Sequence, residues 1–411
     1  MRVLLVSDEF GRPENTGYRQ RIANISRALA SLRDDPDGLR WLILARMEAG
    51  DRGAPVDIDI VPHVVPVPYR RRRLAIAHWP FARLPWRLMA IDLRSLRRTH
   101  RRLLADQLPF DLVFLTQIDT WAALRPMLDR VLAPGGLVAL DYNDVESAKQ
   151  TGRRRAHRHE GGIVQRARNT ALAIDAHRWA RLEQQAAANT TSFVCSEVDR
   201  RRLGGRPEVL PNAVPAPPVG YRRHPAVQPT MLFVGSLTYE PNIDGLRLMI
   251  EEILPLVRDA VPTAVLRVVG HGYNERVVQL AACPGVELVG EVDSVAPELA
   301  NATLSVVPLR FGGGTRIKIL EAFAHEVPVV STTVGAEGLD VRAGEDCVLA
   351  DTPEAFAEAC VRLLRDPIEA ARLVANARAL AATHDAARIR ADFIATLRSV
   401  HAERRAAQTS R

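Results

Sequence analysis

Short apolar runs alternate with longer segments of helical periodicity along the chain, and this alternation restricts the fold more than any other feature. Continuously apolar strands separated by helices are typical of a parallel sheet that is covered on both faces. In the first half, strands are expected at Val3–Ser7, Trp41–Ala45, Ile58–Val61, Leu112–Thr116, Leu137–Asp141 and Ser192–Cys195. Helices are expected between them, for example at Tyr18–Leu32 and Trp86–Leu104.

The alternation is interrupted once, by a stretch with six prolines from Pro211 to Pro229. Proline at this density sustains neither helix nor sheet and indicates a linker. The pattern then restarts, with helices such as Asn242–Val257 and Pro353–Leu364 and with strands expected at Met231–Gly235, Ala264–Val269, Val286–Val289, Leu304–Val307, Val327–Ser331 and Val348–Ala350. The sequence therefore predicts an α/β protein of two doubly wound, Rossmann-like halves, which suits a length of 411 residues.

Domain boundaries follow from the same pattern. We expect a first domain at 1–212, a linker at 213–229, a second domain at 230–384, and a C-terminal helix and tail at 385–411 that pack back on the first domain. In open α/β sheets, ligands bind beyond the carboxyl ends of the strands. Two halves that face each other would therefore bind a ligand in the cleft between them.

The passage from Leu304 to Thr332 has the order strand, glycine loop, helix and strand. Three consecutive glycines, Gly312–Gly314, let the backbone approach a ligand closely and adopt positive φ. The loop opens into a helix whose free N–H groups suit a phosphate, and Arg316 and Lys318 add positive charge within one turn. Glu321, further along this helix, is placed to accept hydrogen bonds from two ribose hydroxyls.

A plain flexible loop followed by a solvated helix is the alternative interpretation of these residues. Glycines, two cations and an acid between apolar strands together favour a phosphate site over that alternative. The passage is not a Walker loop, since no Gly-Lys-Ser/Thr follows. The pair Gly270 and Gly272 is not a dinucleotide motif either, because Glu275 stands where a third glycine is needed.

The segment Gly312–Leu339 resembles the donor-site signature of glycosyltransferase family 4. Three other passages resemble that family in the right order: Leu210-Pro211-Asn212, Phe233-Val-Gly235-Ser236-Leu-Thr-Tyr239-Glu-Pro241-Asn242, and Val289-Gly290-Glu-Val. The resemblance covers nearly the whole second half and, more weakly, the first. It implies a GT-B fold, in which two Rossmann-like domains face each other across a cleft. It also implies a retaining, metal-independent enzyme that uses a nucleotide sugar as donor and needs no cofactor.

The resemblance also assigns roles to single residues. Donor contacts fall on Gly235, Ser236, Tyr239, Gly290, Gly312, Gly313, Gly314, Thr315, Arg316, Lys318 and Glu321. Arg316 and Lys318 would offset the charge of the departing diphosphate during catalysis, and Glu321 would hold the ribose. The chain departs from the family at two positions. Gly313 stands where many members carry the acid that orients the donor sugar, and Glu326 replaces the glycine that ends the signature helix.

The first half offers fewer candidates. Of the family's glycine-rich loop, Gly17 and at most Gly11 remain. Gly17 and Arg19 are placed to face the donor phosphate or an anionic acceptor, although an ordinary capped helix start is an equal alternative. Asn143 and Asp144 follow a strand, near the position where the family often carries a histidine. Asp144 is a candidate catalytic base or acceptor ligand, and a structural acid at a helix start is the alternative. No metal site is expected there.

Positive charge is concentrated in two clusters, although the net charge is only +7. Eleven arginines lie between Tyr69 and Leu104, and a second cluster runs from Arg153 to Arg181. Such fields attract anions, but a genomic preference for arginine is an equally good explanation. The mixture of arginines and aromatic residues in 70–104 suits either an anionic membrane surface, with a lipid-linked acceptor, or a loop packed on its own core. No nucleic-acid recognition module is found, so nucleic acid is not an expected partner.

No apolar run reaches the roughly 18 residues of a transmembrane helix, and the four cysteines are widely spaced. Both features suit a cytoplasmic protein, with peripheral contact at the inner membrane face as one option.

The sequence thus predicts a retaining glycosyltransferase that moves a sugar from a nucleotide-diphosphate donor to an acceptor hydroxyl of a polysaccharide, glycolipid or natural product. Two other hypotheses remain at this point. One is a sugar-nucleotide epimerase of the same build. The other is a catalytically idle homologue that binds nucleotide or scaffolds a complex, which the missing acid at Gly313 favours.

Overall fold

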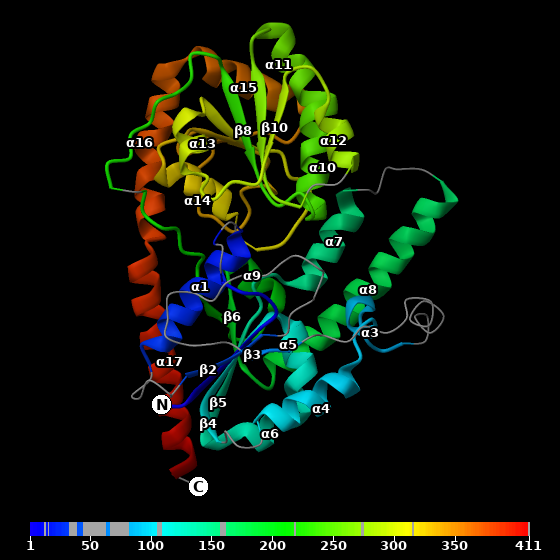
Figure 1. Ribbon diagram of the computed structural model, residues 1–411. Coiled ribbons are helices and arrows are strands. Elements are labelled where there is room, and N and C mark those ends of the chain that lie inside the picture. Colours follow the sequence, from blue (N-terminus) through cyan, green and yellow to red (C-terminus); the bar gives the residue numbers. More distant parts are fainter. Residues whose placement is uncertain are drawn as a thin grey trace. The chain divides into compact units, whose positions relative to one another are not determined.

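The structure is a computed structural model that describes residues 1–11, 14, 16–32, 39–43, 63–65, 82–104, 109–156, 162–217, 219–272, 275–314 and 316–409. The chain separates into two compact units. The first comprises Met1–Glu14, Tyr18–Pro211 and Ala387–Arg411, and the second comprises Asn15–Gly17 and Asn212–Ala386. Each unit contains its own sheet and helices (Figure 1).

The first unit is built on a parallel sheet with the strand order β3-β2-β1-β4-β5-β6-β7. The central strand β1 is buried at every position, which explains why its sequence is continuously apolar. The strands are β1 (Val3–Ser7), β2 (Leu39–Ile43), β3 (His63–Val64), β4 (Phe110–Thr116), β5 (Leu132–Asp141), β6 (Thr191–Val194) and β7 (Glu208–Val209). The helices are α1 (Gly17–Ala30), α3 (Trp86–Met89), α4 (Leu93–Leu104), α5 (Gln117–Leu124), a 3-10 turn (Arg125–Met127), α6 (Leu128–Val131), α7 (Glu146–Ala156), α8 (Ile163–Ala187) and α9 (Glu197–Leu203).

The second unit repeats this architecture, with the parallel strand order β10-β9-β8-β11-β12-β13. Its strands are β8 (Thr230–Val234), β9 (Val265–Val269), β10 (Val286–Gly290), β11 (Leu304–Val307), β12 (Val329–Ser331) and β13 (Val348–Leu349). Its helices are α10 (Glu240–Leu248), a π-helical segment (Met249–Ile253), α11 (Leu254–Ala260), α12 (Glu275–Ala281), α13 (Ala296–Asn301), α14 (Ile317–Ala324), α15 (Pro353–Arg365) and α16 (Pro367–Thr383). The fold class predicted from the alternation is therefore confirmed at the level of both sheets.

One predicted helix was wrong in its extent. The segment 86–104 forms two helices, α3 and α4, because the chain breaks at Ala90–Asp92. The Asp92 carboxylate accepts hydrogen bonds from the backbone N–H groups of Arg94 (3.1 Å) and Ser95 (3.3 Å), so it caps a new helix start. The predicted helix at 242–257 is likewise divided by the π-helical segment. The predicted strand at Ile58–Val61 lies outside the described residues.

The proline-rich stretch contains neither helix nor strand among its described residues. It packs on the second unit through backbone hydrogen bonds, from His224 N to Ala300 O (2.8 Å) and from Ala226 N to Asn301 O (2.9 Å). Proline prevents regular structure here, and the neighbouring N–H groups are satisfied by the domain surface instead.

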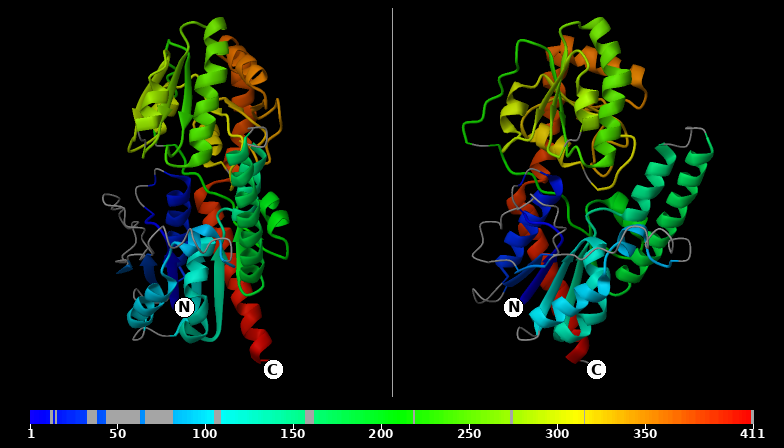
Figure 2. Two further views of the ribbon diagram at one scale, coloured as in Figure 1. Left: turned by 90° about the vertical axis from the view of Figure 1, so that its right-hand side faces the viewer. Right: turned by 45° about the vertical axis from the view of Figure 1, so that its right-hand side comes forward.

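The last helix, α17 (Ala386–Thr409), packs on the first unit from its second residue onward. The Phe393 ring contacts Phe114 and Phe193 edge-on, with centroids 5.5 and 5.3 Å apart. Arg390 donates a hydrogen bond to Asn24 Oδ1 at 2.9 Å. Figure 2 shows α17 running along the first unit, beside its sheet. Aromatic pairs of this geometry contribute beyond their buried area, so they anchor the helix.

A buried ion pair connects α1 with the carboxyl end of β5. The Arg21 guanidinium donates two hydrogen bonds to the Asp141 carboxylate (2.6 and 2.8 Å) and a third to the Leu210 carbonyl (2.8 Å). Both side chains are almost fully buried, at 2% and 0% exposure. The carboxylate therefore depends on this one arginine for its charge compensation within the described part of the unit.

We predict that Arg21→Met lowers the free energy of unfolding of the first unit by about 3–5 kcal/mol, because it leaves a buried charge uncompensated. Tryptophan fluorescence during urea unfolding measures this unit selectively, since Trp41, Trp79, Trp86, Trp121 and Trp179 all belong to it. Arg27→Met is the matched control, because Arg27 pairs with Glu14 while 28% exposed and should contribute no more than about 1 kcal/mol. Equal losses in the two variants would contradict this account of the pair.

Candidate active site

The carboxyl edge of the second sheet brings together most of the residues predicted to bind a donor. Gly235 follows β8, Gly270 follows β9 and Gly290 ends β10. Backbone hydrogen bonds join them, from Gly235 N to Val269 O (3.0 Å) and from Gly270 N to Gly290 O (2.8 Å). Gly290 has a φ of +84°, which a side chain would strain. This edge is where ligands of open α/β sheets bind.

Two of these glycines are needed for close packing. A Cβ on Gly270 would lie 1.9 Å from the Gly235 carbonyl oxygen, closer than any real contact. A Cβ on Gly235 would lie 2.6 Å from Asn242 Nδ2 and 2.8 Å from Lys318 Nζ. The missing side chain at Gly235 therefore leaves room for an amide and an ammonium group at the end of β8.

The glycine loop before α14 adopts the backbone conformations that its sequence predicts. Gly312 and Gly314 have φ of +144° and +63°. A Cβ on Gly312 would lie 2.5 Å from Arg316 Nη2, and the Gly313 carbonyl accepts a hydrogen bond from Arg316 Nη1. The loop therefore lies against the arginine that follows it. Thr315, also predicted as a donor contact, lies outside the described residues.

Arg316 and Lys318 form a pair of cations without a carboxylate partner in the part of the chain that the structure describes. Arg316 is 6% exposed, and its Nε and Nη2 find no hydrogen-bond acceptor among the described residues. Lys318 Nζ donates to Asn242 Oδ1 at 2.9 Å and lies 5.2 Å from the centre of the Phe233 ring. Neither cation makes an ion pair with a described acid. Buried cations normally have such a partner, so this pair indicates a place for an anion.

The charge of Lys318 is sensitive to its surroundings. Burial and the neighbouring Arg316 together lower the pKa of Lys318 to about 7, although Glu321 opposes the change. Lys318 and Glu321 are three residues apart on α14 and share one face of the helix. Glu321 is itself partly exposed.

Ser236 and Tyr239 lie in the turn between β8 and α10. Ser236 Oγ lies 2.9 Å from Thr238 Oγ1 and 3.3 Å from His271 Nε2. Tyr239 is the residue before α10 and is partly buried. His271 was missed as a site residue in the sequence, although it stands between Gly270 and Gly272 directly after β9. Asn242 was also missed, and its role depends on a contact with a residue 76 positions away.

The helix α14 ends at a strained residue. Glu326 has a φ of +60°, at the position where the family resemblance expects a glycine. Its carboxylate forms an ion pair with Arg378 at 3.3 Å, but both side chains are well exposed. An exposed pair of this kind contributes little to stability.

Glu326→Gly should therefore raise the free energy of unfolding of the second unit by about 0.5–1 kcal/mol, since glycine adopts positive φ without strain. Differential scanning calorimetry would measure the change. Arg378→Ala removes only the ion pair and should leave stability nearly unaltered. A loss of stability in Glu326→Gly would show that the ion pair outweighs the backbone strain.

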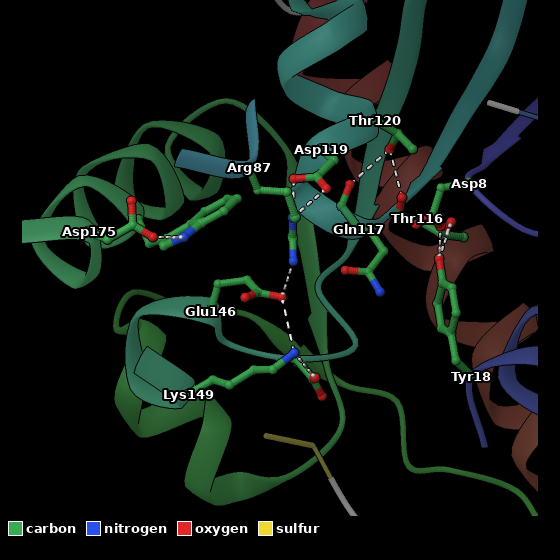
Figure 3. A network of polar contacts seen from close by, with 12 residues as sticks. Asp8, Tyr18, Arg87, Thr116, Gln117, Asp119, Thr120, Glu146, Lys149 and Asp175 are labelled. Carbon is green, nitrogen blue, oxygen red and sulfur yellow. Dashed lines mark hydrogen bonds and ion pairs between the residues drawn. The ribbon is translucent and has the colours of Figure 1, made fainter. Parts of the chain in front are cut away.

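In the first unit, Asp144 belongs to a chain of alternating charges. Figure 3 shows Lys149, Glu146, Arg87 and Asp119 of this chain. Lys149 Nζ lies 3.3 Å from the Asp144 carboxylate and 3.6 Å from that of Glu146. Arg87 joins Glu146 (2.9 Å) to Asp119 (2.7 Å). Burial alone would raise the pKa of Glu146, but Lys149 and Arg87 hold it at about 2. The network therefore fixes the loop between β5 and α7 and keeps Glu146 ionised.

The remaining candidates of the first half have other partners. Arg19 is 6% exposed and pairs with Glu9 at 3.2 Å. The Asn143 carbonyl accepts a hydrogen bond from Cys195 Sγ at 3.0 Å. Gly17, the first residue of α1, is grouped with the second unit rather than with the rest of its helix.

Backbone strain marks the carboxyl edge of the first sheet. Asn143 and Gln117 have φ of +53° and +66°, and they follow two neighbouring strands, β5 and β4. Asparagine tolerates this conformation, whereas glutamine rarely adopts it. Figure 3 shows the Gln117 side chain extending away from Asp119, with no partner drawn for its amide. Strain of this kind is concentrated at functional sites, and Gln117 was not identified from the sequence.

The described residues include no group of three or more histidines, cysteines and acids that could hold a metal ion. Within the same part of the chain, no helix combines the length and apolar character needed to cross a bilayer.

Comparison with protein families finds a match that lies within the second unit. A family model described as "Glycosyl transferases group 1" matches residues 228–366. A curated Klebsiella pneumoniae protein, named only as an uncharacterized 44.6 kDa protein in the cps region, is 27% identical over 158 residues. That match covers 36% of this chain and 41% of the relative, so the chain spans less than half the length of this relative.

Solved structures match over nearly the whole chain. Sucrose-phosphate synthase from Thermosynechococcus elongatus has a TM-score of 0.67 at 18% identity and covers 98% of this chain and 100% of its own. Anabaena HepE in complex with UDP-glucose has a TM-score of 0.61 at 14% identity, covering 97% and 100%. WaaG, a glycosyltransferase involved in lipopolysaccharide biosynthesis, has a TM-score of 0.60 at 16% identity, covering 95% and 98%. At this identity the likeness shows the fold, which is the GT-B class of two Rossmann-like domains.

Proposed function

We propose that this chain is a glycosyltransferase that takes its sugar from a nucleoside-diphosphate donor. The buried pair Arg316 and Lys318, which lacks a carboxylate partner among the described residues, carries the proposal. A diphosphate would supply the missing negative charge and the acceptors for the unused N–H groups of Arg316. The family match over 228–366 and the GT-B fold support the same activity.

The remaining donor contacts follow from the same edge of the sheet. The loop Gly312–Gly314 and the first N–H groups of α14 would face the diphosphate, and Glu321 would accept hydrogen bonds from the ribose. Gly235, Ser236, Tyr239 and Gly290 would line the rest of the nucleotide site. Arg316 and Lys318 would stabilise the departing diphosphate as the bond to the sugar breaks.

We further propose membership of glycosyltransferase family 4, with retention of anomeric configuration and without a metal ion. The sequence departs from the family signature at Gly313 and Glu326 but matches it closely at its other positions. With no acid at position 313, the donor sugar would have to be oriented by other groups. The acceptor hydroxyl would bind to the first unit, where Asp144 and Asn143 border the end of β5. We place the enzyme in the cytoplasm, where its free cysteines would stay reduced.

A panel of UDP-, GDP-, dTDP- and ADP-sugars tests the proposal by thermal shift, because a ligand that binds only the folded state raises the melting temperature. We expect one base to stabilise the protein clearly and the others weakly or not at all. The stabilising nucleotide sugar is then incubated with candidate acceptors and with none. Conversion of the donor alone into another sugar nucleotide would identify an epimerase instead.

A catalytically idle homologue is the second candidate, and the observation that favours it is Gly313 in place of an acid. It predicts nucleotide binding without transfer. Transfer to any acceptor dismisses it. Binding without turnover over a broad set of acceptors, including lipid-linked ones, would favour it over the enzyme.

A further inference from the structure

The helices α7 and α8 pack against each other in the first unit and extend together beyond its sheet (Figures 1 and 2). We call residues 153–155 and 162–168, where α7 finishes and α8 begins, the hairpin end. Ile163 and Val164 lie there with 85% and 83% of their surfaces exposed. Two adjacent branched aliphatic side chains this exposed contribute little to packing against the described residues.

The hairpin end is also strongly basic. The last turn of α7 contains Arg153, Arg154 and Arg155, and the first turns of α8 contain Arg166 and Arg168. No acid occurs within 153–155 or 162–168. Arg154, Arg155 and Arg166 are exposed and make no ion pair with another described residue. The positive field of this region is therefore not neutralised by those neighbours.

The start of α8 adds to this field. Its cap residue is Gly162, which has no side chain to accept a hydrogen bond, and the first turn contains no acid. Arginines near the positive end of a helix dipole oppose the usual preference for acids there. An external anion at the hairpin end would pair with Arg154, Arg155 and Arg166 and with the positive end of this helix.

We propose that the hairpin end is a docking surface for bilayers that contain anionic lipids. Ile163 and Val164 would enter the boundary between headgroups and acyl chains, while the surrounding arginines bind lipid phosphates. A nucleic-acid backbone explains the arginines but leaves the two aliphatic side chains against phosphate, so the membrane is favoured. This surface consists of other residues than the basic region 70–104, and the proposal goes beyond the transfer activity.

Sedimentation of the full chain with vesicles tests the proposal. Wild type should bind phosphatidylcholine vesicles that contain phosphatidylglycerol, and should bind pure phosphatidylcholine much less. We expect Ile163→Ser with Val164→Ser to weaken binding about tenfold. Arg154→Glu with Arg155→Glu should weaken it by at least about 25-fold, at about fivefold per arginine.

Matched variants elsewhere on the surface serve as controls. Ile368→Ser removes an aliphatic side chain that is 82% exposed in the second unit, and Arg201→Glu reverses an exposed charge on α9. Both should bind vesicles as wild type does. Equal binding of the hairpin-end variants and wild type would overturn the proposal.

A fluorescent probe can show where the hairpin end lies on the vesicle. Cys283 is exposed while the other three cysteines are buried, so Val164→Cys in a Cys283→Ser background can be labelled selectively with an environment-sensitive dye. Vesicle binding should raise the emission, and brominated acyl chains should quench it. Unchanged emission, together with DNA-duplex binding that depends on the same arginines, would assign the surface to nucleic acid and refute membrane docking.

Discussion

Arg316→Ala and Lys318→Met should each weaken binding of the nucleotide sugar about 10- to 100-fold, because each removes charge-assisted contacts to the diphosphate. Neither substitution should destabilise the unliganded protein. Arg316 is buried with N–H groups that lack acceptors among the described residues, and burial lowers the pKa of Lys318 to about 7. Burying a cation without an acidic partner costs free energy, and its removal relieves that cost. Calorimetric titration and thermal melting of the same samples measure both effects.

Arg342→Ala is the control for Arg316→Ala, since Arg342 lies on the surface of the second unit and pairs with Asp346. It should bind nucleotide sugar as wild type does. If Arg316→Ala instead lowered the melting temperature and left the affinity unchanged, Arg316 would be a structural residue of its loop. Glu321→Ala should weaken the binding of nucleosides as well as that of nucleotides, because both contain the ribose.

Gly270→Ala should destabilise the second unit by about 3 kcal/mol and abolish donor binding. The new methyl group would lie 1.9 Å from the Gly235 carbonyl oxygen, so the ends of β8 and β9 must separate. That movement would carry Ser236 and His271 apart and shift the backbone beside Lys318. Thermal melting and nucleotide titration of the variant measure the two losses.

Gly344→Ala separates overlap from backbone strain. Gly344 has a φ of +75°, yet a Cβ there meets nothing within 4 Å. In Gly344→Ala, the free energy of unfolding should fall by only about 1 kcal/mol, the strain of a non-glycine residue at positive φ, and donor affinity should be unchanged. A Gly270→Ala variant as mild as this control would mean that the strand ends move apart easily and that the close packing there has little importance.

The fold could be predicted because continuous apolar strands leave a direct trace in the sequence. Val3–Ser7 and Leu304–Val307 were predicted with the bounds that the structure has. The division of 86–104 into two helices was missed, since a helical pattern does not reveal that Asp92 turns its carboxylate onto the following N–H groups. The π-helical segment at Met249–Ile253 has no sequence signal that we can identify.

The candidate site was predictable where chemistry is local and unpredictable where it depends on distant contacts. The glycines, Arg316, Lys318 and Glu321 lie within one short passage, so their spacing indicated a phosphate site. The contact of Asn242 with Lys318 and the position of His271 beside Ser236 arise only when the ends of β8 and β9 meet. Likewise, the sequence left open whether Asp144 is structural, and its ion pair with Lys149, which also contacts Glu146, emerges only in the folded network.

Proton uptake on donor binding tests the central claim most directly. The unliganded Lys318 loses its proton as pH rises through about 7, and a diphosphate beside it would favour the charged form and raise its pKa. Titration of the nucleotide sugar at about pH 8, in two buffers of different ionisation enthalpy, should therefore show uptake of roughly half to one proton per molecule bound. The uptake should vanish in Lys318→Met. Binding with no proton uptake, or with the same uptake in that variant, would place the diphosphate away from Lys318 and contradict the proposed site.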